Sequence, residues 1–245
     1  MAYRRRPVDE HTVNALPRRA LAEFLGTAFL VAVVVGSGIM AVRLSPNDVG
    51  LQLLENAVAT AAGLVALILA FGSVSGAHFN PVVSIVDARL GGLTPRELGA
   101  YIGAQISGAC AGSILANLMF DLPAIEWSTK SRSHSGLWLA EVVATIGLLL
   151  VIFGSTRTNA RATPFAVGGY IGAAYFFTSS TSFANPAVTV GRMMSDTFAG
   201  IEPASVPAFI GAQLVGAALG YGLIRVLFPR VDASAAVVPH PAQES

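Results

Sequence analysis

The chain has 245 residues, of which 53% are hydrophobic and only 12% are charged, and its mean hydropathy is +0.64. Ordinary soluble domains carry about 25% charged residues, so this composition indicates a membrane protein. The net charge of +1 gives no basic surface for nucleic acid, and a single cysteine, Cys110, excludes an intramolecular disulfide and every multi-cysteine metal site. We expect no cofactor and no bound metal.

Six apolar stretches follow one another along the chain. The first continues to Val42 after an arginine-rich beginning, which is too long for a signal-peptide core, so we expect an uncleaved first span. The others run near 51–72, 98–120, 137–154, 165–178 and 207–228. A span needs roughly 20 apolar residues, so six spans leave only short loops and no soluble catalytic domain. The sequence therefore predicts an all-α polytopic membrane protein that is not an enzyme.

The distribution of basic residues predicts the orientation of these spans. If both termini are cytoplasmic, the inner side holds Arg4, Arg5, Arg6, Arg18, Arg19, Arg89, Arg96, Arg157, Arg161, Arg225 and Arg230, whereas the outer side holds Arg43, Lys130, Arg132 and Arg192. Because basic residues concentrate on the cytoplasmic side of membrane proteins, this excess supports the orientation. We expect a multi-pass protein of the cell's inner (plasma) membrane, surrounded by the lipid bilayer.

The two halves of the chain repeat one another. AEFLGT at 22–27 returns as AEVVAT at 140–145, IGAQ at 102–105 returns at 210–213, and the Asn-Pro dipeptides at 80–81 and 185–186 occupy the same place in each half. Each half holds three spans, an odd number, so the second copy is inverted relative to the first. We expect a cytoplasmic segment at 1–19, a first repeat at 20–120, a connecting loop at 121–136, an inverted second repeat at 137–228 and a cytoplasmic tail at 229–245.

Each Asn-Pro dipeptide lies in a segment that is unusually apolar for a loop. Asn is favoured just before a helix and Pro at its first position, so each segment predicts a short helix beginning at Pro81 or Pro186. Entering the membrane from opposite faces, the two N-termini meet near the midplane, where irregular backbone is tolerated if it lines a polar cavity. Their positive dipole ends repel cations and leave neutral molecules unaffected. This arrangement predicts a pore for uncharged solutes.

The segments SGAHFNPV at 75–82 and NPA at 185–187, with the paired Ala-Glu span starts, resemble the aquaporin (major intrinsic protein) family over roughly residues 20–228. The resemblance implies a right-handed bundle of six transmembrane helices with two re-entrant half-helices, a pore in every subunit and a homotetramer. It also implies that Asn80 and Asn185 donate hydrogen bonds into the centre of the pore. Glu23 and Glu141 would hold the re-entrant loops in place, and His78 would shape its loop or lie beside a gate.

The outer constriction departs from the pattern of water-selective members of that family. Those members place an arginine directly after the second signature alanine, and this chain has Val188 there. Counting back from Asn80 places Thr60 where water channels have a bulky aromatic residue, and the loop position three before Asn185 is Ser182. The resemblance therefore implies a wider and less polar constriction that has lost its fixed positive charge.

The fourth member of this constriction lies on the fifth span, near Ala173, Ala174 or Tyr175. Anchoring the count on Pro164 favours Tyr175, whereas counting back from the second signature asparagine favours Ala173, so both remain candidates. Arg192, which also lies near the outer mouth, is interpreted as a vestibule or interface residue rather than a filter residue.

The combination of Thr60 and Val188 resembles the bacterial arsenic-handling aquaporins, the aquaporin S group. Such channels are understood to pass arsenite and methylated arsenicals, and arsenous acid at neutral pH is an uncharged polyol of about glycerol's size. A facilitator for glycerol, urea or ammonia, or a broad water channel, is the alternative. A more distant alternative is a proton-coupled secondary transporter that uses Glu23 or Glu141 as its coupling site.

Overall fold

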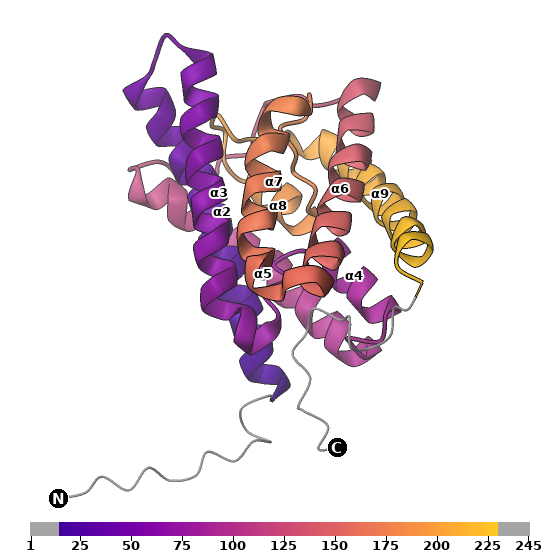
Figure 1. The fold of residues 1–245 in the computed structure, drawn as a ribbon. Helices are drawn as coiled ribbons and strands as arrows, with labels where there is room; N and C mark the ends of the chain where they lie inside the picture. The colour runs from indigo at the N-terminus through magenta and orange to yellow at the C-terminus, as the bar shows by residue number, and fades with distance from the viewer. Residues whose placement is uncertain (1–14, 230–245) are drawn as a thin grey trace, which may run out of the picture.

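A computed structural model describes residues 15–229 and shows a bundle of helices, with no strand in that part of the chain (Figure 1). The first half contains α2 (Leu16–Leu44), α3 (Val49–Ser75), α4 (Pro81–Arg89) and α5 (Pro95–Met119). The second half contains α6 (Ser135–Asn159), the 3-10 turn η1 (Ala160–Ala162), α7 (Thr163–Phe177), α8 (Pro186–Arg192), the 3-10 turn η2 (Pro203–Ser205) and α9 (Val206–Leu227).

Six of these helices cross the membrane. Five stretches are long and apolar enough to do so, and one of them, Ser135–Phe177, contains 43 residues and covers both α6 and α7. A straight helix of that length would measure about 65 Å, roughly twice the hydrocarbon core of a bilayer. The chain instead reverses at η1, and Pro164 lies in the first turn of α7, so α6 and α7 lie side by side (Figure 1). The predicted six-span, all-α architecture is confirmed.

The helix ends follow from local sequence signals. Asp48 caps α3, because its side chain accepts a hydrogen bond from the Leu51 N–H at 2.9 Å. Thr94 and Glu97 form a reciprocal capping box at the start of α5, with Pro95 at the first helical position. Gly76 ends α3 with a φ of 84°, a left-handed conformation that costs glycine little. These signals fix where α3 stops and where the first re-entrant segment begins.

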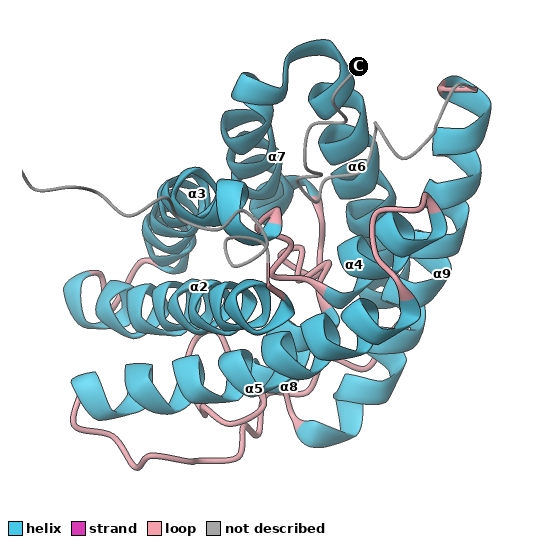
Figure 2. Ribbon diagram, turned by 90° about the horizontal axis from the view of Figure 1, so that it is seen from below, coloured by secondary structure: helices cyan, strands magenta, loops and turns pink. Residues whose placement is uncertain are grey.

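The two halves interlock as inverted copies. Helix α2 packs on α3 and α5 as α6 packs on α7 and α9, while α4 also contacts α9 and α8 also contacts α5. Each half-helix thus rests on a long helix of the other half. In the view along the bundle, the long helices surround the irregular segments that precede α4 and α8 (Figure 2). The fold therefore carries two non-helical segments into the interior of the bundle.

Close helix packing in this bundle depends on glycine. A Cβ atom at Gly108 of α5 would lie 2.3 Å from the carbonyl oxygen of Phe24 on α2, and one at Gly112 would lie 2.1 Å from that of Ala28. Because no side chain fits at these distances, glycine permits the close approach of α2 and α5.

The start of the first span lies earlier than the sequence predicted. Helix α2 begins at Leu16, so Arg19 belongs to the bundle and not to the flanking segment expected at 1–19. Its side chain is buried, donating from Nη1 to Glu97 Oε1 at 2.6 Å and from Nε to the Tyr101 hydroxyl at 2.9 Å. Helix α6 likewise begins at Ser135, two residues before the predicted repeat. Most of the predicted tail at 229–245, and residues 1–14, lie outside the described residues.

Candidate pore and its outer constriction

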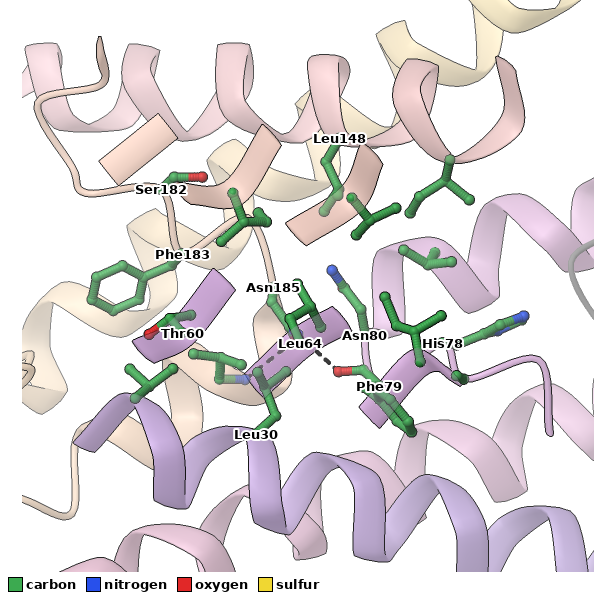
Figure 3. Close-up of a pocket in the computed structure, with 18 of the residues that line it drawn as sticks. Leu30, Thr60, Leu64, His78, Phe79, Asn80, Leu148, Ser182, Phe183 and Asn185 are labelled. Carbon is green, nitrogen blue, oxygen red and sulfur yellow. Dashed lines mark hydrogen bonds between the residues drawn. The ribbon is translucent and has the colours of Figure 1, made fainter. Parts of the chain in front are cut away.

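The two signature asparagines connect the half-helices across the centre of the bundle. Asn80 Nδ2 donates to the carbonyl of Ala184 at 2.8 Å. Asn185 Nδ2 donates to the carbonyl of Phe79 at 2.8 Å (Figure 3). Each Oδ1 atom accepts from the first turn of its own half-helix, with Val82 N at 3.1 Å for Asn80. An amide group carries two N–H bonds, so each asparagine retains one donor, and both side chains border the internal cavity.

The segments before the asparagines hold a strained backbone. Ala77 and Phe79 have φ values of 51° and 49°, and the repeat-related Ser182 and Ala184 have values of 50° and 46°. Left-handed backbone at residues other than glycine costs roughly 1–3 kcal/mol each, and such strain persists only where the surroundings impose it. Ala77 and Phe79 thus share their backbone conformation with Ser182 and Ala184, the residues 105 positions later. Both halves of the fold therefore impose the same loop path.

Glu23 of α2 imposes that path in the first half. Its carboxylate accepts hydrogen bonds from Ser75 Oγ (2.6 Å), His78 N (3.0 Å), Phe79 N (2.7 Å) and Gln105 Nε2 (2.7 Å). The side chain is fully buried. A buried carboxylate is tolerated only when its lone pairs are satisfied, and here loop backbone provides two of the donors.

Glu141 of α6 does the same in the second half. Its carboxylate accepts from Phe183 N at 2.9 Å, Ala184 N at 2.8 Å and Gln213 Nε2 at 2.7 Å. Gln213 Nε2 also donates to Thr189 Oγ1 at 2.9 Å, as Gln105 Nε2 donates to Ser84 in the first half. The two acids therefore join the long helices to the loops and the half-helices.

In the second half, the position equivalent to His78 is occupied by Phe183, so the histidine is not repeated. His78 Nδ1 lies 2.9 Å from Ser84 Oγ, and His78 Nε2 lies 3.8 Å from Asp87 Oδ2. The histidine borders the end of the cavity remote from Ser182 and Phe183 (Figure 3). Among residues 15–229, no group of three or more His, Cys, Asp or Glu side chains is arranged to hold a metal ion.

The cavity encloses about 80 Å³ and has walls of two kinds. One side is apolar and includes Leu30, Val34, Leu64, Ile68, Leu148, Ile152, Val167 and Ile171. The other side consists of the two loops and the asparagines, and the carbonyls of 76–78 accept no hydrogen bond from any residue that the structure describes. A cavity of this volume has room for more than one water molecule. A neutral solute can hydrogen-bond along one side, whereas an ion loses most of its hydration.

Four side chains of the expected outer constriction border one end of this cavity: Thr60, Tyr175, Ser182 and Val188. Thr60 Oγ1 lies 3.1 Å from the Tyr175 hydroxyl, and Ser182 Oγ is buried with no partner among the described residues. The other candidate on the fifth span, Ala173, is exposed on the outside of the bundle and does not border the cavity. Of the two candidates that the sequence left open, Tyr175 borders the cavity and Ala173 does not.

Arg192, for which the sequence suggested a vestibule or interface position near the outer mouth, also borders the cavity. It ends α8, one helical turn beyond Val188, and its guanidinium lies 3.4 Å from the ring centroid of Phe183. A positive charge therefore lies at this end of the cavity, one turn beyond Val188, while position 188 itself carries none. The i, i+4 spacing from position 188 is the signal that could have identified Arg192, but the motif directed attention to position 188 alone.

Comparison with known proteins places this geometry in context. Residues 10–182 match the profile of the family described as Major intrinsic protein. The chain is 51% identical over 212 residues to an aquaglyceroporin, AqpS, of Rhizobium meliloti (strain 1021), covering 86% of this chain and 91% of the relative. It is 31% identical over 259 residues to a glycerol uptake facilitator protein of Pseudomonas aeruginosa, covering 89% and 91%.

A solved structure has the same fold. The X-ray structure of the aquaglyceroporin from Plasmodium falciparum superposes with a TM-score of 0.69 at 21% identity, covering 89% of this chain and 99% of that chain. At this identity the match concerns the fold alone.

Proposed function

The chain belongs to the major intrinsic protein family, and we propose that it is a passive channel whose solutes include arsenous acid and methylated arsenicals. Proteins of this family are channels and not enzymes. The chain is accordingly a multi-pass membrane channel for small neutral solutes, such as glycerol and water. The proposal concerns which of these solutes the outer constriction favours.

The observation that carries the proposal is the chemistry of the four side chains at the outer end of the cavity. Thr60, Tyr175 and Ser182 present hydroxyl groups, and Val188 presents an isopropyl group in place of an arginine. The Ser182 hydroxyl forms no hydrogen bond to the described residues, and the side chain borders the cavity. Arsenous acid is uncharged and carries three hydroxyl groups, and methylation replaces a hydroxyl with an apolar methyl group that suits Val188.

Glycerol is the second candidate, because the same hydroxyl groups suit any small polyol. The glycerol uptake facilitator of Pseudomonas aeruginosa is among the relatives of this chain at 31% identity. Glycerol and arsenous acid differ at the apolar contact, since methylated arsenicals bring a methyl group to Val188 and glycerol brings only hydroxyl-bearing carbons. A comparison of the two solutes therefore tests the proposal.

The decisive experiment measures arsenite, methylarsenical, glycerol and water permeability in proteoliposomes by stopped flow. In Val188→Arg we expect the arsenite-to-water permeability ratio to fall by about tenfold or more, because a guanidinium fills the opening and binds water. Val188→Leu, which adds bulk without charge, should lower the ratio less. An unchanged ratio in Val188→Arg would show that this residue does not select the solute. A wild type that passes glycerol well and arsenicals poorly would establish the second candidate.

We propose that the channel is a homotetramer with a pore in every subunit, and that both termini are cytoplasmic in the plasma membrane. The excess of arginine on the predicted inner side supports this orientation. Native mass spectrometry of the purified protein tests the tetramer. Accessibility of a cysteine introduced at Ser135 or at Arg161, on opposite ends of α6 and η1, tests the orientation.

A further inference from the structure

The outer end of the cavity contains a buried positive charge. Arg192 is the last residue of α8, one turn beyond Val188, and only 2% of its surface is exposed. Its Nε–H donates to the carbonyl of Ala199, and its guanidinium lies against the ring of Phe183. Its one hydrogen bond to residues 15–229 is made by Nε, and the side chain borders the cavity.

A second arginine lies against the same ring. Arg132, in the loop between α5 and α6, has its guanidinium carbon 4.9 Å from the Phe183 centroid. It donates from Nε to the carbonyl of Gly200 at 3.0 Å and from Nη1 to the carbonyl of Ser180 at 3.3 Å. Burial lowers the pKa of Arg132 to about 10, which leaves it protonated at neutral pH. The two guanidinium groups are therefore held in place by hydrogen bonds to backbone carbonyl groups and by contact with the ring of Phe183.

No carboxylate forms an ion pair with either arginine in the part of the chain that the structure describes. The ion pairs recorded there join Arg19 to Glu97 and His78 to Asp87. The acids nearest in the outer loops bind elsewhere, since Asp196 accepts from Ser128 and Thr129, and Glu202 accepts from Ser205. Glu141 accepts only from loop backbone and Gln213. The positive charge at this end of the cavity is therefore offset only through space, because Glu141 interacts electrostatically with both arginines without forming an ion pair.

We infer that Arg192, supported by Arg132, excludes cations from the outer mouth, while the opening at Thr60 and Val188 one turn deeper selects solutes by size. The exclusion of cations by charge and the selection of neutral solutes by size are thereby assigned to different residues. This arrangement lets a bulky neutral solute pass a wide opening without admitting sodium, ammonium or protons. It rests on the chain being a channel and does not depend on which neutral solute is transported.

Three features of the structure stabilise an unpaired arginine at this position. The C-terminus of α8 carries partial negative charge, which favours a cation in the last turn. The face of Phe183 attracts the guanidinium, and the Ala199 carbonyl accepts its Nε–H. A cation that enters the mouth loses hydration at the same point where it meets this charge, so repulsion acts at reduced screening.

The test compares cation and neutral-solute flux in the same proteoliposomes. Vesicles with a trapped sodium-sensitive or pH-sensitive dye report cation entry, and stopped-flow light scattering reports glycerol entry. For Arg192→Gln we expect the ratio of sodium to glycerol permeability to rise by about tenfold or more. Arg192→Lys, which keeps the charge, should remain close to the wild type. Arg132→Gln should give a smaller rise, because this side chain does not border the cavity.

Two further variants complete the design. Arg225→Gln changes an exposed arginine in the last turn of α9 and should leave the ratio unchanged. The double variant Val188→Arg/Arg192→Gln returns a charge one turn deeper and should restore cation exclusion. If Arg192→Gln folds poorly, Arg192→Met serves as a second neutral variant. An unchanged ratio in a neutral variant that still passes glycerol would overturn the inference, whereas a wild type that passes no neutral solute would overturn the proposed function.

Discussion

The two buried glutamates give a sharp prediction about what holds the pore loops in place. Replacing Glu23 or Glu141 with Gln keeps the size of the side chain but turns one acceptor oxygen into an NH2 donor. Each oxygen of either carboxylate accepts from at least one backbone N–H of a loop. Whichever oxygen is replaced, a donor then faces a donor. We therefore expect both variants to be destabilised and the affected loop to move.

The size of the effect follows from these contacts. A hydrogen bond to a charged group contributes about 1.5–3 kcal/mol, and each substitution removes at least one and converts the others into neutral bonds. A net loss of about 2–4 kcal/mol is expected for either variant. Phe79 and Ala184 in these loops have a strained left-handed backbone, which the hydrogen bonds to the glutamates help to maintain. When those bonds are weakened, the loops relax from this conformation more readily.

The assay measures the unfolding temperature in detergent and glycerol flux in proteoliposomes. Glu126→Gln, an exposed position in the loop after α5, is the matched control and should behave as the wild type. Both buried variants should lose thermal stability and flux, with no dependence of the remaining flux on a pH gradient. Normal stability and normal flux in Glu23→Gln would refute the role of this carboxylate. Selective loss of a proton-driven uptake would instead favour the transporter alternative.

Two other substitutions test residues around the pore. Gly26→Ala should destabilise the protein by about 1–3 kcal/mol and reduce glycerol flux, because the new Cβ would lie 1.9 Å from the buried ring of Phe79. The control is Gly103→Ala, where a Cβ has nothing within 4 Å and should not lower the unfolding temperature. Thr60→Val should keep the width of the outer opening but remove the hydroxyl that lies 3.1 Å from Tyr175, so polyol permeability should fall relative to water in stopped flow. Equal effects on both solutes would contradict this reading.

The parts of the fold that the sequence predicted depend on local signals. Apolar length gave the six spans, and Asn followed by Pro gave the starts of α4 and α8, because capping requires only neighbouring residues. The inverted repeat followed from matched segments such as those at 22–27 and 140–145. The exact ends were less accurate, since Arg19 belongs to α2 through partners on α5 that are 78 and 82 residues away.

The remaining features depend on contacts that no local pattern encodes. Left-handed backbone at Ala77 and Ser182 is imposed by the long helices, and neither residue type favours it. The choice between Ala173 and Tyr175 required the rotation of α7 about its axis, which a count from a distant anchor could not give. The structure turns Tyr175 toward Thr60 and leaves Ala173 on the outer surface.

The repeat explains why the charge at the outer mouth lies at position 192. Positions 78 and 87 in the first half correspond to 183 and 192 in the second, and in both halves the side chains of the pair lie against each other. The first half pairs a histidine with an aspartate, and the second pairs a phenylalanine with an arginine. The two pairs thus occupy equivalent places in the two halves, but only His78 of the first pair borders the cavity, whereas both Phe183 and Arg192 of the second do. The guanidinium at this end of the cavity therefore belongs to Arg192, one helical turn beyond the apolar Val188.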